Sequence, residues 1–393
     1  MMKILITTDT YFPMINGVVT STNNLYKELK AKGHEVKILT LSHRSEEWSE
    51  GDIYYLKSVK AGIYPDARIK VPFYNKLVKE ILDWKPDIVH SQTEFSTMIA
   101  AKHIARKLNI PHIHTYHTLY EDYLKYILNG RVIKKGAAAM FTKLLLNSLD
   151  GVVAPTDKTK EVLEGYGVNT YMHVVPTGID LRKFQREISK EEKEELYRKL
   201  NLKKEDKIIA YVGRIAEEKN ISEIISLFPS VLEKAENTKL LIVGGGPYID
   251  ELRQQVDNMK LEGKVIFAGM VKPEEVYKYY KLAHIFVTAS TSETQGLTYL
   301  EALSTGCPIV CKYDKCIEGV VLQGINGYSY KTEVQFSDYI SRILLNDSLR
   351  LSMSEAAQAK ADEYSSSTFA SNILEAYNKT IEYSEFINVQ VGA

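Results

Sequence analysis

Short apolar runs alternate with amphipathic segments throughout the first half of the chain. The amphipathic segments repeat their apolar residues every three or four positions, which is the helical period, whereas the apolar runs have the length of buried strands. Strands are predicted at 3–9 (KILITTD), 35–42 (EVKILTLS), 86–92 (PDIVHSQ), 111–117 (PHIHTYH) and 151–156 (GVVAPT), with helices within 16–34 and 95–109. This alternation predicts an α/β fold built on a doubly wound parallel sheet.

The same pattern begins again after residue 205. Strands are predicted at 207–215 (KIIAYVGRI), 239–247 (KLLIVGGGP), 265–270 (VIFAGM), 284–290 (HIFVTAS) and 307–312 (CPIVCK), with helices at 221–235 and 248–260 between them. The second half of the chain therefore predicts another parallel sheet of the same Rossmann-like kind.

A segment at 174–187 is predicted to link the two halves, because Pro176 and Gly178 interrupt the pattern there. We expect a first domain over 1–182 and a second over 183–367, with a final helix at 368–393 that packs back onto the first domain. Ligands of open parallel sheets bind outside the carboxyl ends of the strands. A cleft between two such sheets is therefore the expected site.

Composition changes this picture little. The chain has 393 residues, of which 45% are hydrophobic and 25% are charged, as in an ordinary globular protein. The formal net charge is +0, which does not favour nucleic acid as a partner. Residues 1–180 carry 23 Lys/Arg against 19 Asp/Glu (+4), and the rest carries 27 against 31 (−4). The first domain is therefore the better candidate for an anionic partner.

Three cysteines, Cys307, Cys311 and Cys316, lack the spacing and the fourth ligand of a zinc site and are expected to be reduced thiols. The amino-terminal segment predicts a strand and a turn rather than a signal peptide. Apolar runs of the roughly 18–20 residues that a spanning helix needs do not occur. A cytoplasmic location, or one on the inner face of a membrane, is expected.

Two loops at predicted strand ends offer groups that bind anions. Gly17 follows the first strand just before a helix, where backbone N–H groups suit a phosphate, although a plain turn remains the alternative. Gly213 and Arg214 end a later strand, and Lys219 follows five residues after Arg214. Both cations are expected at the carboxyl end of the sheet, in reach of one anionic ligand. The alternative is a solvated turn in which Lys219 pairs with a neighbouring glutamate.

The segment 288–310 (TASTSETQGLTYLEALSTGCPIV) carries two acids, Glu293 in a predicted loop and Glu301 in the predicted helix that follows. Eight helical residues span about 12 Å, roughly the length of a nucleotide diphosphate with a group at its far end. The N–H groups of Gly296, Leu297 and Thr298 lie between the acids at a helix N-terminus, where phosphate binds. A cap and a solvated face are the alternative, which the apolar surroundings of Glu301 disfavour.

His117 comes just past a predicted strand end, where a catalytic or ligand-binding residue would lie, whereas His112 and His114 are expected on strand faces. Aromatic residues follow in one stripe at helical spacing, which core packing would also explain: Tyr116, Tyr120, Tyr123 and Tyr126. Basic residues then occur without any acid among apolar ones: Lys125, Arg131, Lys134, Lys135 and Lys143. Such a segment either lies on an anionic bilayer or forms a surface helix with extended lysines.

Together these motifs resemble the retaining glycosyltransferases of family GT4, which have the GT-B fold of two Rossmann-like domains facing across a cleft. VGRIAEEKN resembles the donor-phosphate motif, SETQGLTYLEALSTGCPIV the E-x7-E signature, and NGVV the amino-terminal glycine loop. The resemblance implies a nucleotide-sugar donor, most often UDP-linked. It implies donor-binding roles for Gly17, Gly213, Gln295, Gly296, Leu297, Thr298 and Glu301, and catalytic roles for Arg214, Lys219, Glu293 and His117. Gln295 departs from the family, which often has an apolar residue there.

The resemblance also implies a mechanism. Arg214 and Lys219 would stabilise the diphosphate leaving group by preorganised charge, with Glu301 on the ribose and Glu293 on the sugar. Asp-x-Asp, the usual metal-donor signature of the other large glycosyltransferase fold, does not occur, so no metal and no other cofactor is expected. Retention would proceed by front-face attack, the leaving phosphate assisting deprotonation of the acceptor.

For the acceptor, the segment YHTLYEDYLKYI and the basic stretch after it resemble bacterial 1,2-diacylglycerol 3-glucosyltransferases. The resemblance assigns membrane or acceptor contacts to Tyr120, Tyr123, Lys125, Arg131, Lys134 and Lys135, and implies glucose transfer to diacylglycerol. The alternatives are a protein, polysaccharide or other glycan acceptor, a catalytically silent subunit of the same fold, and a nucleotide-sugar epimerase.

Overall fold

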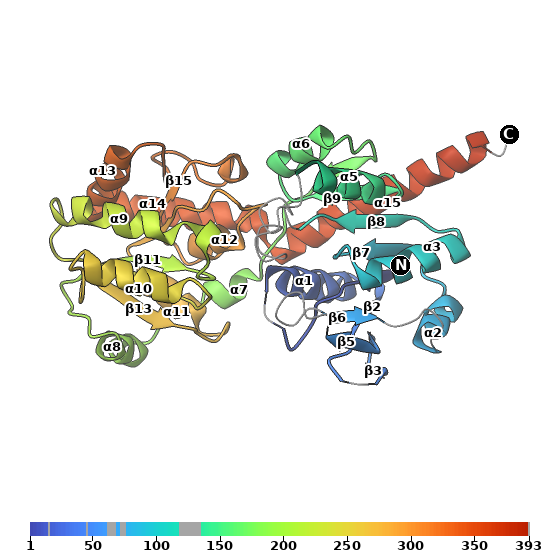
Figure 1. Ribbon diagram of the computed structural model, residues 1–393, viewed down its shortest axis with the longest axis horizontal. Helices are drawn as coiled ribbons and strands as arrows, with labels where there is room; N and C mark the ends of the chain where they lie inside the picture. The colour runs from blue at the N-terminus through green and yellow to red at the C-terminus, as the bar shows by residue number, and fades with distance from the viewer. Residues whose placement is uncertain (15, 45, 61–67, 71–75, 118–134, 392–393) are drawn as a thin grey trace. The chain divides into compact units, whose positions relative to one another are not determined.

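The computed structural model describes the chain except residues 15, 45, 61–67, 71–75, 118–134 and 392–393 (Figure 1). It divides into two compact units. Unit 1 comprises Met1–Ile179 and Ser366–Ala393, and unit 2 comprises Asp180–Ser365. The chain therefore leaves unit 1 within the segment predicted as a linker and returns to it for its last helix.

Unit 1 is built on a sheet of order β10-β9-β8-β7-β1-β2-β4-β3 in its described part, parallel except that β3 pairs antiparallel with β4. Its strands are β1 (Lys3–Thr7), β2 (Glu35–Leu41), β3 (Trp48–Glu50), β4 (Ile53–Leu56), β7 (Ile88–Ser91), β8 (His112–Thr115), β9 (Gly151–Ala154) and β10 (Met172–Val174). A small ribbon consists of β5 (Ser58–Lys60) and β6 (Arg68–Lys70). Its helices are α1 (Gly17–Ala31), α2 (Lys76–Trp84), α3 (Ser96–Leu108), α5 (Lys135–Leu146), α6 (Asp157–Gly165) and α15 (Ser366–Val391).

Both faces of this sheet are covered, as its nearly continuous apolar strands require. In β1, Ile4 and Ile6 point to a core shared with α1 and with the carboxyl-terminal helix α15, red in Figure 1. Leu5, between them, points to the opposite core, which α2 and α3 complete. The alternation of side chains along one strand thus holds helices from both ends of the chain on the same sheet.

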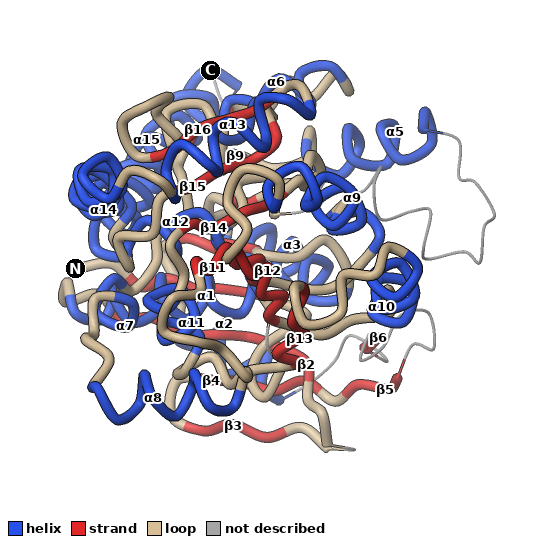
Figure 2. Tube along the Cα trace, turned by 90° about the vertical axis from the view of Figure 1, so that its left-hand side faces the viewer, coloured by secondary structure: helices blue, strands red, loops and turns tan. Residues whose placement is uncertain are grey.

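Unit 2 has a parallel sheet of order β13-β12-β11-β14-β15-β16, of which β11, β12 and β13 are neighbouring red strands in Figure 2. Its strands are β11 (Lys207–Val212), β12 (Thr238–Val243), β13 (Val265–Gly269), β14 (Ile285–Thr288), β15 (Ile309–Lys312) and β16 (Gly327–Tyr330). Its helices are α7 (Leu181–Phe184), α8 (Lys190–Lys199), α9 (Ile221–Leu232), α10 (Ile249–Asn258), α11 (Val276–Leu282), α12 (Leu297–Ser304), α13 (Glu333–Leu344) and α14 (Asp347–Ala361), with single 3-10 turns η1 (Glu217–Lys219), η2 (Lys315–Ile317) and η3 (Asp362–Tyr364).

The core of unit 2 also has two faces. Helices α9, α10 and α13 pack on one of them. On the other, Phe286 of β14 contacts the rings of Tyr280 from α11 and Tyr299 from α12. Two Rossmann-like parallel sheets confirm the predicted α/β fold class, and strand order brings the carboxyl ends of β11 and β14 together at one edge.

Candidate functional site

The loop after β11 is shaped by a second glycine loop that the sequence pattern did not single out as functional. A Cβ atom on Gly244 would lie 1.8 Å from the carbonyl oxygen of Gly213, and one on Gly246 would lie 2.0 Å from that of Ile215. The backbones are joined by hydrogen bonds, among them Ile215 N–H to Gly245 O at 2.9 Å. Three consecutive glycines directly after a strand were the available signal for this close approach.

The two predicted cations both lie at this edge, and each is held by a carboxylate. Arg214 forms an ion pair with Glu218 in η1. Lys219 Nζ lies 2.6 Å from Glu293 Oε1, and both side chains are largely buried. Lys219 therefore pairs with a glutamate that is distant in the sequence. Its partner comes from the loop after β14, which lies beside β11, so the structure brings together two residues that were predicted from separate motifs.

Hydrogen bonds to neighbouring strands fix the turn that carries Lys219. Asn220, which follows Lys219, has φ +51° in the left-handed region, and its Nδ2 donates to Glu223 Oε2 at 2.5 Å. Glu223 also accepts from Lys312 Nζ at 2.5 Å and from Tyr330 OH at 3.0 Å. These charge-assisted bonds tie the end of η1 to β15 and β16.

Helix α12 begins as the sequence predicted, with Leu297 as its first residue. Gly296 precedes it at φ +73°, and a Cβ there would lie 2.5 Å from the ring of Tyr299, so glycine is required. Among the described residues, this N-terminus has no capping side chain. Its first backbone N–H groups, including those of Leu297 and Thr298, therefore remain suited to an anion. Gln295, just before it, is buried.

Glu301 lies one turn into α12 and is held by a residue that the sequence analysis missed. Tyr280 of α11 donates its OH to Glu301 Oε2 at 2.9 Å. Burial raises the pKa of Glu301 to about 7, opposed by the bond from Tyr280 and the charge of Lys183. The two glutamates thus differ in environment, since Glu293 faces a cation and Glu301 a phenol. Tyrosine is common in this chain, so no local pattern pointed to Tyr280.

In unit 1 the structure differs in detail from the prediction for Gly17. Gly17 is the first residue of α1 rather than part of a free turn, because the side chain of Asn16 caps the helix by accepting from Val19 N–H at 2.9 Å. His117 follows β8 as predicted, and its Nε2 lies 2.8 Å from Gln92 Oε1. Burial and the neighbouring His114 lower the pKa of His117 to about 3.

The predicted membrane or acceptor segment falls mostly outside the described residues. That applies to Tyr120, Tyr123, Lys125, Arg131 and Lys134. Lys135 begins α5, whose described side chains include three exposed apolar ones, Met140 (56%), Phe141 (53%) and Leu144 (67%). In the part of the chain that the structure describes, helices with the length and apolar character to cross a bilayer do not occur.

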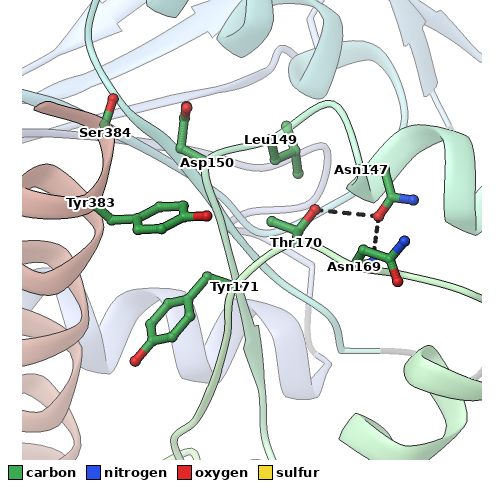
Figure 3. Close-up of a pocket in the computed structure, with 8 residues that line it drawn as sticks. All are labelled: Asn147, Leu149, Asp150, Asn169, Thr170, Tyr171, Tyr383 and Ser384. Atoms are coloured by element: carbon green, nitrogen blue, oxygen red, sulfur yellow. Dashed lines mark hydrogen bonds between the residues drawn. The ribbon is translucent and has the colours of Figure 1, made fainter. Parts of the chain in front are cut away.

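A hollow of about 380 Å³ lies in unit 1, at the amino ends of strands β9 and β10 (Figure 3). Its lining comes from the loops that precede β9 and β10 and from α15: Asn147, Leu149, Asp150, Asn169, Thr170, Tyr171, Tyr383 and Ser384. Asn147 Oδ1 accepts from Thr170 Oγ1 at 3.4 Å and from Asn169 N–H at 2.8 Å. The predicted site residues are all absent from this lining, so the hollow is separate from the candidate site.

Comparison with known proteins covers almost the whole chain. Residues 15–183 match the family described as Glycosyltransferase Family 4, and residues 192–360 match that described as Glycosyl transferases group 1. The chain is 38% identical over 349 residues to a Streptococcus pneumoniae protein named alpha-monoglucosyldiacylglycerol synthase, covering 88% of this chain and 78% of that protein. An Acholeplasma laidlawii protein of the same name is 30% identical over 391 residues, covering 97% and 98%.

The fold has close counterparts among solved structures. The crystal structure of Anabaena HepE in complex with UDP-glucose aligns with a TM-score of 0.73 over 96% of this chain and 100% of that one. At 16% sequence identity, this likeness concerns the fold.

Proposed function

Because the chain belongs to glycosyltransferase family 4, we propose that it transfers glucose from UDP-glucose to a hydroxyl group of diacylglycerol. Family membership makes the chain a glycosyltransferase, and its two Rossmann-like sheets have the GT-B fold. The proposed acceptor draws on the name of the two relatives, and the proposed donor on the UDP-glucose in the Anabaena structure.

The observation that carries this proposal is the cluster at the carboxyl edge of β11 and β14. Arg214 and Lys219 lie there with the open N-terminus of α12 and with Glu293, while Glu301 follows one turn later. A nucleotide sugar needs cations and amides for its diphosphate and carboxylates for its hydroxyl groups. This cluster offers all of these within one unit.

We assign the diphosphate to Arg214, Lys219 and the first amides of α12, the sugar to Glu293, and the ribose to Glu301. Both cations form internal ion pairs, so the diphosphate would share or replace carboxylate partners that already orient them. Fixed cations can stabilise the leaving group without a divalent metal. An alpha-linked product from UDP-glucose, whose own linkage is alpha, would mean retention of configuration, consistent with front-face attack.

The lipid acceptor is supported by α5. Its exposed Met140, Phe141 and Leu144 lie beside Lys143 in the sequence, Lys135 is its first residue, and further basic residues precede it in the sequence. An apolar surface flanked by basic residues suits the interface of an anionic bilayer. We propose that α5 contributes to binding at the membrane surface, where diacylglycerol is found.

The first test measures sugar transfer with several donors and acceptors. UDP-glucose, UDP-galactose and GDP-mannose are combined with diacylglycerol in phosphatidylglycerol vesicles, with diacylglycerol in phosphatidylcholine vesicles, and with soluble glycans. We expect alpha-glucosyl transfer from UDP-glucose to diacylglycerol, faster on the anionic vesicles and unchanged by EDTA. Transfer only to soluble glycans would overturn the lipid acceptor, and loss of activity in EDTA would overturn metal independence.

The role of α5 is tested in the same assay. Phe141→Ser with Leu144→Ser should reduce sedimentation with anionic vesicles and activity on vesicular diacylglycerol. Leu351→Ser, on an exposed position of α14 in unit 2 (54% exposed), is the matched control and should change neither. Equal sedimentation of all three proteins would exclude α5 from the membrane contact.

A further inference from the structure

Gln92 is a buried polar residue at the carboxyl end of β7 that the proposed function leaves unassigned. Its backbone N–H donates to Thr7 O at 2.8 Å, which extends the pairing of β7 with β1 by one residue. Its side chain is 1% exposed. Residues in this position, directly past a parallel strand, face the edge at which ligands of such sheets bind.

One end of the Gln92 amide is occupied by His117. Gln92 Oε1 lies 2.8 Å from His117 Nε2. An amide oxygen only accepts hydrogen bonds, so His117 donates from Nε2 and its Nδ1 is the acceptor nitrogen of the neutral ring. Gln92 thereby fixes both the tautomer and the orientation of the imidazole.

The other end of the amide has no such partner. Among the described residues, Gln92 Nε2 is buried and makes no hydrogen bond. An unsatisfied buried donor is destabilising, and a native group of this kind calls for an explanation.

The neighbouring polar groups already bond to one another. Ser91 Oγ lies 2.8 Å from His112 Nε2 and 2.9 Å from His114 Nδ1. Glu94 Oε1 lies 3.4 Å from His114 Nε2. These contacts centre on Ser91 and do not include the Gln92 amide; among the described residues, His112 Nδ1 and Thr7 Oγ1 are likewise buried without a hydrogen bond.

We propose that Gln92 positions His117 with one end of its amide and binds a substrate hydroxyl group with the other. This inference rests on the proposed function, which supplies hydroxyl groups on the hexose of the donor and on the lipid acceptor. A hydroxyl oxygen accepts from the amide N–H₂ of Gln92, which makes a hydroxyl group a suitable ligand for this end.

Two substitutions separate the two ends of the amide. Gln92→Glu keeps an oxygen for His117 Nε2–H and removes the amide donor, whereas Gln92→Met keeps the approximate size and removes both. Gln254→Glu, on an exposed position of α10, is the matched control for the added charge. KM and kcat are measured for UDP-glucose and for diacylglycerol from pH 5 to 9, together with the melting temperature of each variant.

We expect Gln92→Glu to raise one KM about tenfold, the loss of one hydrogen bond being worth ~1.4 kcal/mol, and the affected substrate identifies the source of the hydroxyl. The new carboxylate should also raise the pKa of His117, which adds a pH dependence that the wild type and Gln254→Glu lack. Gln92→Met should lower kcat as well, because His117 loses its orientation. Unchanged KM values and pH profile in Gln92→Glu, with altered melting temperatures alone, would overturn the proposal.

A second readout does not depend on turnover. In the full chain with isotope-labelled histidines, the ring signals of His117, assigned by their loss in His117→Ala, should remain those of a neutral ring from pH 5 to 8 in the wild type. They should titrate within that range in Gln92→Glu, and their failure to do so would overturn the Gln92–His117 contact. Lack of glucosyl transfer by the wild type would instead contradict the proposed function, and this titration would still test the contact.

Discussion

Glu293 and Glu301 lie eight positions apart in the chain, but their carboxylates contact different groups. Glu293 bonds to the Lys219 ammonium at 2.6 Å, whereas Glu301 accepts from the Tyr280 phenol at 2.9 Å. Burial is the main reason why the pKa of Glu301 is raised to about 7, and the hydrogen bond from Tyr280 and the charge of Lys183 only partly oppose it.

Glu301 should therefore make stability depend on pH. Its pKa rises from the ordinary 4.5 to about 7 on folding, so the folded state binds more protons between these values and the free energy of unfolding falls as pH rises through them. The amide of Glu301→Gln does not titrate, so this variant lacks the decrease. The difference in the free energy of unfolding between Glu301→Gln and the wild type, measured by urea unfolding, should therefore grow in favour of the variant by up to about 3 kcal/mol from pH 4.5 to pH 8.

The control for Glu301 is Glu355→Gln, on an exposed position of α14, which should show no such trend. A difference between Glu301→Gln and the wild type that stays constant across this range would contradict the raised pKa. If Glu301 also binds the ribose hydroxyl groups, the wild-type KM for UDP-glucose should fall as pH rises through about 7, and Glu301→Gln should flatten that dependence.

Lys219 has two roles that one substitution cannot separate, since it neutralises Glu293 and is assigned to the diphosphate. Lys219→Ala should lower kcat/KM by a factor that corresponds to a loss of about 2–4 kcal/mol in transition-state stabilisation. Replacing Glu293 in the same protein tests which of the two roles of Lys219 accounts for the lower activity. If Lys219 acts on the diphosphate, Lys219→Met with Glu293→Gln should bind UDP, which lacks the sugar assigned to Glu293, as weakly as Lys219→Met alone.

The stability of the same variants provides the control for this cycle. Lys219→Met leaves a largely buried carboxylate without its cation, so it should destabilise the protein, and Glu293→Gln should recover part of that loss. Recovery of stability without recovery of UDP affinity is the expected pattern. Recovery of both would mean that Lys219 serves only to neutralise Glu293.

At the scale of elements, the sequence predicted what depends on nearby residues. The apolar runs gave the strands, and the helix that begins at Leu297 followed from the pattern around it. The pattern could not predict contacts between residues that are distant in the chain. Lys219 and Glu293 are 74 positions apart, and Gly244 must be a glycine because the backbone of Gly213 crosses it. Such requirements arise only when strands β11, β12 and β14 pair.

At the scale of the whole molecule, the last helix completes the first unit. Helix α15 contributes Phe369, Ile373 and Tyr377 to the core on one face of the unit 1 sheet. The OH of Tyr377 lies 2.7 Å from Nδ1 of His90 in β7, and both residues are fully buried. The sequence analysis predicted a final helix that packs back onto the first domain, whereas its position beside α1 on this face of the sheet follows from the topology.

The stability of unit 1 should therefore depend on helix α15, which follows unit 2 in the chain. Removing residues 366–393 uncovers an apolar face of the sheet, so we expect the unfolding transition of unit 1 to disappear in calorimetry while that of unit 2 persists. Tyr377→Phe is the finer change. It leaves His90 without this partner and should destabilise unit 1 by about 1–3 kcal/mol, whereas Tyr383→Phe, at a 47% exposed position of the same helix, should have little effect. A truncated chain that keeps both transitions would show that α15 is dispensable for the fold of unit 1.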